Sequence, residues 1–114
     1  MNRPDWSIII PLHNEAGSLP ELLARLERTV AGLPGRAEVL LVDDASTDTT
    51  PQLLAAANHP PFSSIRLPTQ SGQLQATLAG LAHCTGHFVA VMDGDLQDPP
   101  EILLDLHRTL AEQP

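Results

Sequence analysis

Lysine is absent from this 114-residue chain, so six arginines must balance 14 Asp and Glu residues, and the formal net charge is −8. Nucleic-acid binders need clustered cations, and this composition argues against a nucleic-acid partner. A Walker A phosphate loop is excluded, because that motif requires a lysine. An anionic ligand would need a bound metal to offset the electrostatic repulsion.

Cysteine and aromatic residues are also scarce. Cys84 stands alone, which excludes an intrachain disulfide. Tyrosine is missing, and Trp6, Phe62 and Phe88 are the only aromatic residues besides histidine, so aliphatic side chains must build the core. The chain has no apolar run of about 18 residues and no signal peptide, which predicts a soluble, cytoplasmic piece. One Cys and five scattered His give no zinc-ligand spacing, and no G-x-G-x-x-G follows the first apolar run.

Short apolar runs alternate with helical patterns along the chain. Helical spacing follows a capping box at Ser18 and Glu21, and Asp98 with Glu101 predicts a second box. The predicted strands are residues 7–12, 38–42, 64–67 and 87–92. Two helices are predicted at residues 18–33 and 49–57, and a third is marked by Leu74, Leu78 and Leu81. A fourth helix follows Asp98, with Leu103, Leu106 and Leu110 as its buried stripe. This order predicts one α/β domain with a parallel sheet and flanking helices.

Polar residues follow three of the predicted strands, at residues 13–15, 43–48 and 93–98. In a parallel α/β sheet, ligands bind beyond the carboxyl ends of the strands, where the strand order reverses. We therefore expect these three segments to form the functional site.

Asp93 and Asp95 are the sharpest candidates within these segments. In an extended backbone they would face one point, together with Gln97, and Gly94 between them would let a ligand approach closely. Oxygen ligands of this kind suit Mg²⁺ or Mn²⁺. The alternative is a solvated acidic turn that precedes a helix, with Asp98 as the helix cap.

The remaining candidates have two interpretations each. Asp43 and Asp44 end a predicted buried strand, where they would accept hydrogen bonds from a nucleotide or form a turn. Glu15 would contact a base or ribose, or favour the following helix N-terminus. Gly72 would open a helix whose free N–H groups bind an anion, or simply form a turn.

Taken together, these segments resemble family 2 glycosyltransferases. Residues 7–15 (SIIIPLHNE) are similar to V-I-P-x-Y-N-E, residues 42–50 (VDDASTDTT) to V-D-D-G-S-T-D-x-T, and residues 92–101 (MDGDLQDPPE) to M-D-A-D-L-Q-x-P-P-E. The last form is typical of the branch that transfers sugars to polyprenyl phosphates, such as dolichyl-phosphate mannosyltransferase. The resemblance covers residues from about 6 to 110 and implies a GT-A, Rossmann-like fold for the domain 1–114.

The resemblance implies a role for each matching residue. The donor, a UDP- or GDP-sugar, would be bound by Pro11, His13, Asn14, Glu15, Asp43, Asp44, Gly72 and Asp93, and Mg²⁺ or Mn²⁺ by Asp93, Asp95 and Gln97. The sugar would pass with inversion to a polyprenyl phosphate or another glycan acceptor. His13 replaces the usual Tyr, Ala45 a common Gly, and Thr69-Gln70 a frequent Arg-Asn.

The family continues beyond the matching part into an acceptor half that usually carries the catalytic base. We therefore expect a domain truncated at its C-terminus, with no general base in these residues. Its uncovered surface would favour self-association. The complete protein would act at the cytoplasmic face of the membrane, with membrane contact through downstream segments. The alternatives are a non-catalytic nucleotide-sugar-binding module and an Mg²⁺-dependent phosphohydrolase or receiver-like domain, although a receiver would want a lysine near its acidic pocket.

Overall fold

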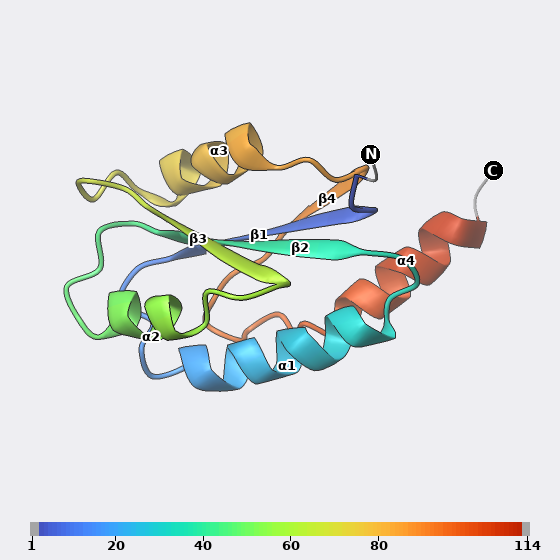
Figure 1. Cartoon of the computed structure of the whole chain (residues 1–114), viewed down its shortest axis with the longest axis horizontal. Coiled ribbons are helices and arrows are strands. Elements are labelled where there is room, and N and C mark those ends of the chain that lie inside the picture. Colours follow the sequence, from blue (N-terminus) through green and yellow to red (C-terminus); the bar gives the residue numbers. More distant parts are fainter. Residues whose placement is uncertain (1–2, 113–114) are drawn as a thin grey trace.

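The computed structural model describes residues 3–112, which fold into one parallel sheet with helices on both faces (Figure 1). The elements follow the order β1 (Trp6–Leu12), α1 (Leu19–Gly32), β2 (Ala37–Asp43), α2 (Thr50–Ala56), β3 (Phe62–Arg66), α3 (Gln73–His83), β4 (Phe88–Val91) and α4 (Ile102–Glu112). All strand pairs are parallel and the strand order is β3-β2-β1-β4. The predicted α/β architecture is confirmed.

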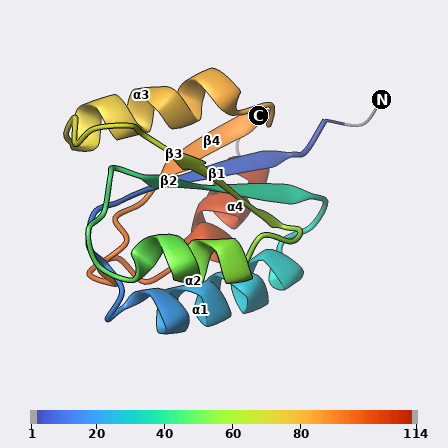
Figure 2. The ribbon, with the colours of Figure 1, turned by 60° about the vertical axis from the view of Figure 1, so that its left-hand side comes forward.

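The aliphatic residues of the central strands supply both halves of the core. Every residue of β1 is buried, as expected for a strand covered on both faces. Ile8 and Ile10 belong to a cluster with leucines of α1, α2 and α4, whereas Ile9 packs on the opposite face with Ala76 of α3. Two views agree on these layers, with α3 on one face of the sheet and α1, α2 and α4 on the other (Figure 2).

Small residues, rather than the predicted leucines, bring α3 onto the sheet. Ala76 and Gly80 are the buried positions of this helix, and a Cβ atom at Gly80 would lie 2.5 Å from Cγ2 of Ile9. Leu74, Leu78 and Leu81 mark the helix correctly, but they lie on its outer side and are 69%, 47% and 41% exposed. The close helix–sheet approach leaves no room for larger side chains on the inner face.

Both capping-box predictions are wrong. Ser18 makes no side-chain cap bond to α1, because its hydroxyl donates to the Gly94 carbonyl, 3.0 Å away, and to Glu15. The last helix begins at Ile102, so its N-cap position is Glu101 and Asp98 stands three positions too early to cap it. Glu101 instead forms an ion pair with Arg25 of α1 at 2.6 Å.

The stripe predicted for the last helix is buried only in part. Leu103 is fully buried, whereas Leu106 and Leu110 are 43% and 42% exposed. They flank β4, an edge strand whose Phe88 and Val91 are also about half exposed. The expected uncovered surface lies along this edge. Among residues 3–112, no helix is both long and apolar enough to cross a membrane.

Candidate active-site cleft

Polar side chains gather at the carboxyl ends of β1, β2 and β4. The chain runs outward from β1 through β2 to β3 and then crosses over to β4 on the other side of β1. Such a reversal opens a crevice beyond the strand ends. A cleft of about 260 Å³ occupies this place; it is lined by Pro11, Leu12, His13, Glu15, Asp44, Gln70, Gly72, Gln73, Ala76, Asp93, Gly94 and Asp95.

The cleft is strongly acidic. Four carboxylates contribute to its lining, from Glu15, Asp44, Asp93 and Asp95, and none of the described residues that line it is an arginine. Repulsion between like charges is costly unless a donor or a cation compensates it. A ligand that carries phosphates would therefore need a positive ion between itself and these groups.

Asp93 and Asp95 meet at the cleft, but not through an extended strand. β4 ends at Val91, and the two carboxylates lie in the turn that follows it. Asp93 accepts a hydrogen bond from Nε2 of Gln73 at 2.8 Å, and Asp95 accepts one from the backbone N–H of Gln97 at 3.1 Å. Each of these bonds engages one Oδ1 atom. A turn, rather than strand alternation, brings the pair together.

Gly94, between the two aspartates, lines the cleft and also packs against the end of β1. A Cβ atom at this position would lie 2.2 Å from Cδ2 of Leu12. Leu12 therefore leaves no room for a larger residue here, and the close approach of a ligand to Gly94 stays a prediction. Gln97 is exposed and does not belong to the cleft lining, so its role as a metal ligand stays a prediction.

Asp44 faces the cleft and holds the loop that precedes α3. This carboxylate is 3% exposed, and its two oxygens accept hydrogen bonds from the backbone N–H groups of Ser71 and Gly72 at 2.7 and 2.9 Å. The N–H of Gly72 is therefore already occupied by Asp44, and anion binding by the N–H groups at the start of α3 stays a prediction. Gly72 itself has a φ of 97°, a conformation that favours glycine.

Asp43 lies behind the cleft rather than in its lining. It is 1% exposed, forms an ion pair with Arg66 of β3, and accepts the backbone N–H of Ser46 at 3.0 Å. Arg66, which the sequence analysis did not single out, also donates to the Ser46 carbonyl. The contact predicted between Asp43 and a nucleotide base is untested, and both of its oxygens already have partners within the protein.

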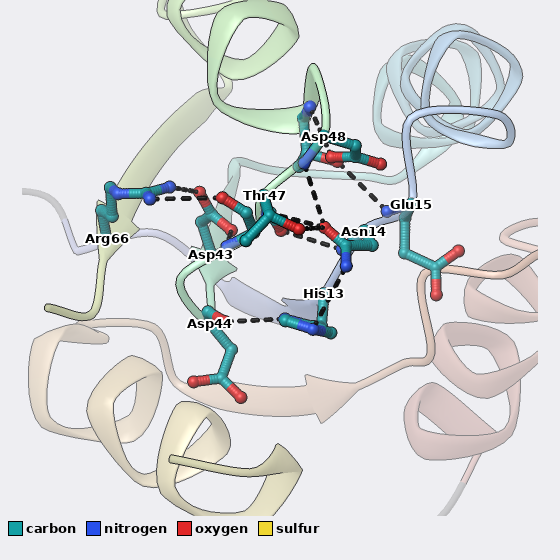
Figure 3. A network of polar contacts seen from close by, with 10 residues as sticks. His13, Asn14, Glu15, Asp43, Asp44, Thr47, Asp48 and Arg66 are labelled. Carbon is teal, nitrogen blue, oxygen red and sulfur yellow. Dashed lines mark hydrogen bonds and ion pairs between the residues drawn. The ribbon is translucent and has the colours of Figure 1, made fainter. Parts of the chain in front are cut away.

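Hydrogen bonds connect the loop after β1 to the loop after β2 (Figure 3). The backbone N–H groups of residues 14, 15 and 16 donate to the side chains of Ser46, Thr50 and Asp48. Hydrogen bonds from Thr50, chiefly from its side chain, lower the pKa of Asp48. Asn14 and Ala45 both have a φ of 54°, and such strained backbone persists where surrounding contacts fix it.

Two glutamines also line the cleft, and neither was predicted as a site residue. Gln73 supports Asp93, and Gln70 lines the cleft from the loop before α3. Gln70 lies at a position where the family that the sequence resembles frequently has Asn, and Gln73 is the first residue of α3. Neutral amides leave the acidic character of the cleft unchanged.

The cleft suits a hard divalent cation that is shared with a ligand. Among residues 3–112, no group of three or more His, Cys, Asp or Glu side chains is arranged to hold a metal by itself. Asp93 and Asp95 nevertheless offer two carboxylates at one cleft, and Mg²⁺ is commonly held by one or two carboxylates together with substrate phosphates. The donor set fits this mode of binding.

Curated relatives share a large part of this chain. The undecaprenyl-phosphate 4-deoxy-4-formamido-L-arabinose transferase of Pseudomonas fluorescens (strain Pf0-1) is 43% identical over 109 residues, covering 93% of this chain and 31% of that protein. The enzyme of the same name from Sodalis glossinidius (strain morsitans) is 44% identical, with 93% and 33% covered. The chain thus spans about a third of the length of these relatives.

Solved structures agree with the fold. The mannosyltransferase PcManGT from Pyrobaculum calidifontis, in complex with GDP-Man and Mn²⁺, superposes with a TM-score of 0.79 at 29% identity, covering 99% of this chain and 34% of that one. S. aureus TarS 1-349 in complex with UDP gives 0.78 at 31% identity, with 95% and 32% covered. The predicted GT-A fold is confirmed. The family model for glycosyl transferase family 2 matches residues 7–114, and the chain therefore belongs to this family.

Proposed function

We propose that this chain forms the part of a glycosyltransferase that binds a nucleoside-diphosphate sugar together with Mg²⁺ or Mn²⁺. One observation carries the proposal: a cleft at the strand-order reversal collects four carboxylates, and no arginine belongs to its described lining. Such a cleft repels a diphosphate unless a cation bridges the two. Family membership makes a sugar nucleotide the natural ligand.

Asp93 and Asp95 would hold the cation, and the diphosphate oxygens would complete its coordination. When bound, the cation would neutralise the leaving nucleoside diphosphate as the glycosidic bond breaks. Gln73 orients Asp93 by donating to one of its oxygens, which leaves the other oxygen for the ion. Gln97 would join the coordination only through a side chain turned toward the cleft.

The nucleoside would lie against Pro11, His13 and Glu15, which line the same cleft from the end of β1. Asp44 lies beside His13, and its carbonyl oxygen is 2.8 Å from Nδ1 of that ring. It fixes the loop that carries Ser71 and Gly72, and this loop forms part of the wall. Asp43 would support the site through Arg66 and the 46–48 loop.

Polyprenyl phosphate is the acceptor class that the relatives' names support, since two of them are undecaprenyl-phosphate sugar transferases. We infer transfer with inversion at the membrane surface, on the cytoplasmic side. No described residue is assigned as the general base. Alignment of acceptor and donor would depend on a region beyond the matching third of those proteins.

A thermal-shift screen tests the donor class. The protein is heated with UDP, GDP, their sugars and the corresponding monophosphates, each with and without Mn²⁺. Diphosphates should stabilise it only with Mn²⁺, and monophosphates much less. In the same screen, the Asp95→Asn variant should lose the Mn²⁺-dependent stabilisation. The Asp105→Asn variant, changed at an exposed residue of α4, should keep it. Stabilisation that ignores both the metal and Asp95 would refute the proposal.

A further inference from the structure

Asn14 occupies a position from which it contacts the loop after β2 rather than the cleft (Figure 3). Its Oδ1 atom accepts the backbone N–H of Thr47 at 2.8 Å and that of Asp48 at 3.2 Å. A backbone N–H can only donate, so the oxygen of the Asn14 amide must be the atom that faces these two groups. The orientation of the amide is thereby fixed.

With its oxygen so placed, the amide turns its nitrogen toward the neighbouring imidazole. Nδ2 of Asn14 lies 3.3 Å from Nε2 of His13. Because an amide NH₂ donates and does not accept, Nε2 must present a lone pair. On the other side of the ring, Nδ1 lies 2.8 Å from the carbonyl oxygen of Asp44, which can only accept. Both contacts are satisfied by one state of the ring, the neutral form with its proton on Nδ1.

Every other state of the ring breaks a bond in this chain of contacts. A proton on Nε2 would face the NH₂ group of Asn14. Turning that amide over would relieve this contact, but it would set the NH₂ group against the N–H groups of Thr47 and Asp48. The surrounding loop is itself held through three backbone N–H donors, so it has little freedom to adapt.

We propose that Asn14 is a positioning residue that fixes His13 as a neutral Nδ1–H imidazole in the wall of the cleft. The inference rests on the proposed function, since it concerns the wall against which the nucleoside would lie. Both ring nitrogens are then engaged within the protein, and neither is left to hydrogen-bond a nucleotide. Glu15, Asp44, Asp93 and Asp95 line the same cleft and would attract a charged imidazolium. A neutral ring forms no ion pair with Asp93 or Asp95, and both of these carboxylates stay available to the metal ion.

The state of the ring is observable by long-range ¹H–¹⁵N correlation NMR of the histidine side chains at pH 7.5, with His13 assigned from His13→Gln. The expected result for the unmodified chain is a protonated Nδ1 and an unprotonated Nε2. A proton on Nε2 in the unmodified chain would overturn the proposal, and this measurement does not depend on the folding of any variant.

Asn14→Asp tests whether the side chain at position 14 sets the protonation of the His13 ring. Aspartate keeps an acceptor for Thr47 and Asp48, but it presents a second acceptor to Nε2, so His13 should carry protons on both nitrogens. Asn58→Asp, the same change at an exposed residue of another loop, should leave His13 as it is in the unmodified chain. An unchanged ring in Asn14→Asp would contradict the proposal.

Adding UDP with Mn²⁺ to the same samples separates this inference from the proposed function. We expect His13 to keep its Nδ1–H state in the complex, whereas a change of tautomer on binding would show that a ring nitrogen contacts the nucleotide and overturn the inference. In Asn14→Ala, Nε2 of His13 loses the donor that lies 3.3 Å away, so a proton on Nε2 should become detectable in the same spectrum. A ring that stays wholly in the Nδ1–H form in this variant would remove the positioning role. If UDP fails to bind the unmodified chain, the proposed function fails, while the tautomer result is decided independently.

Discussion

The ion pair between the buried carboxylate of Asp43 and the half-exposed Arg66 allows a prediction whose size follows from the burial of Asp43. The Asp43 side chain is 2% exposed and that of Arg66 is 51% exposed. Arg66→Met removes the cation and keeps the length of the side chain, leaving Asp43 with the backbone N–H of Ser46 as its remaining donor. Breaking a buried pair costs about 3–5 kcal/mol, and we expect about 2–3 kcal/mol here, because water can replace part of the half-exposed guanidinium.

Thermal unfolding followed by circular dichroism measures this loss. For a chain of this size, about 2–3 kcal/mol corresponds to a decrease in Tm of roughly 8–12 °C. Arg108→Met is the matched control, since its ion pair with Asp105 is 68% and 67% exposed and should contribute at most about 0.5 kcal/mol. Adding Asp43→Asn to Arg66→Met should recover part of the loss, because no buried charge remains. Equal decreases in Tm for the two arginine variants would refute the reasoning.

Three further predictions concern the metal, the packing and the pH dependence. Asp95→Asn should weaken Mn²⁺-dependent UDP binding in calorimetry far more than Asp98→Asn, which lies outside the cleft lining; equal losses would remove Asp95 from the metal site. Gly86→Ala should destabilise the fold by about 1–3 kcal/mol in urea unfolding, because the added Cβ atom would lie 2.6 Å from the backbone of β1. Gly17→Ala is the control and should be nearly neutral, because its added Cβ atom would have no neighbouring atom within 4 Å. A hydrogen bond from Arg25 lowers the pKa of the Glu101 carboxyl group. The ionised carboxylate therefore stabilises the fold above its unfolded pKa, and this contribution is lost as the pH falls through the folded pKa. Glu101→Gln should be less stable than the unmodified chain at pH 7 and equally stable near pH 2 in thermal unfolding.

Strong periodicity made most of the fold predictable. The aliphatic run of β1 and the leucine spacing of α1 place these elements to within a residue or so. The predicted third strand was displaced, because β3 starts at Phe62, and Phe62 itself is buried against β2. Leucine spacing predicted the existence of α3 but not its inner face, since the close approach of Gly80 to Ile9 is a property of the packed sheet.

The candidate site was predictable in its location but not in its internal contacts. Strand ends placed Glu15, Asp44 and Asp93 at one cleft, as the structure has them. No local pattern indicates that Arg66 would neutralise Asp43, because that contact joins two neighbouring strands through the register of their pairing. Motif matching identifies residues that belong to a site, whereas their hydrogen-bond partners depend on the tertiary structure.

The dependence of nucleotide binding on a divalent cation tests the central claim most directly. UDP and GDP are titrated into the protein by isothermal calorimetry, once with Mn²⁺ and once with excess chelator. With four carboxylates in the cleft and no arginine among its described lining residues, we predict binding with Mn²⁺ and a much weaker or undetectable signal with chelator. Equal affinity under the two conditions would contradict the account.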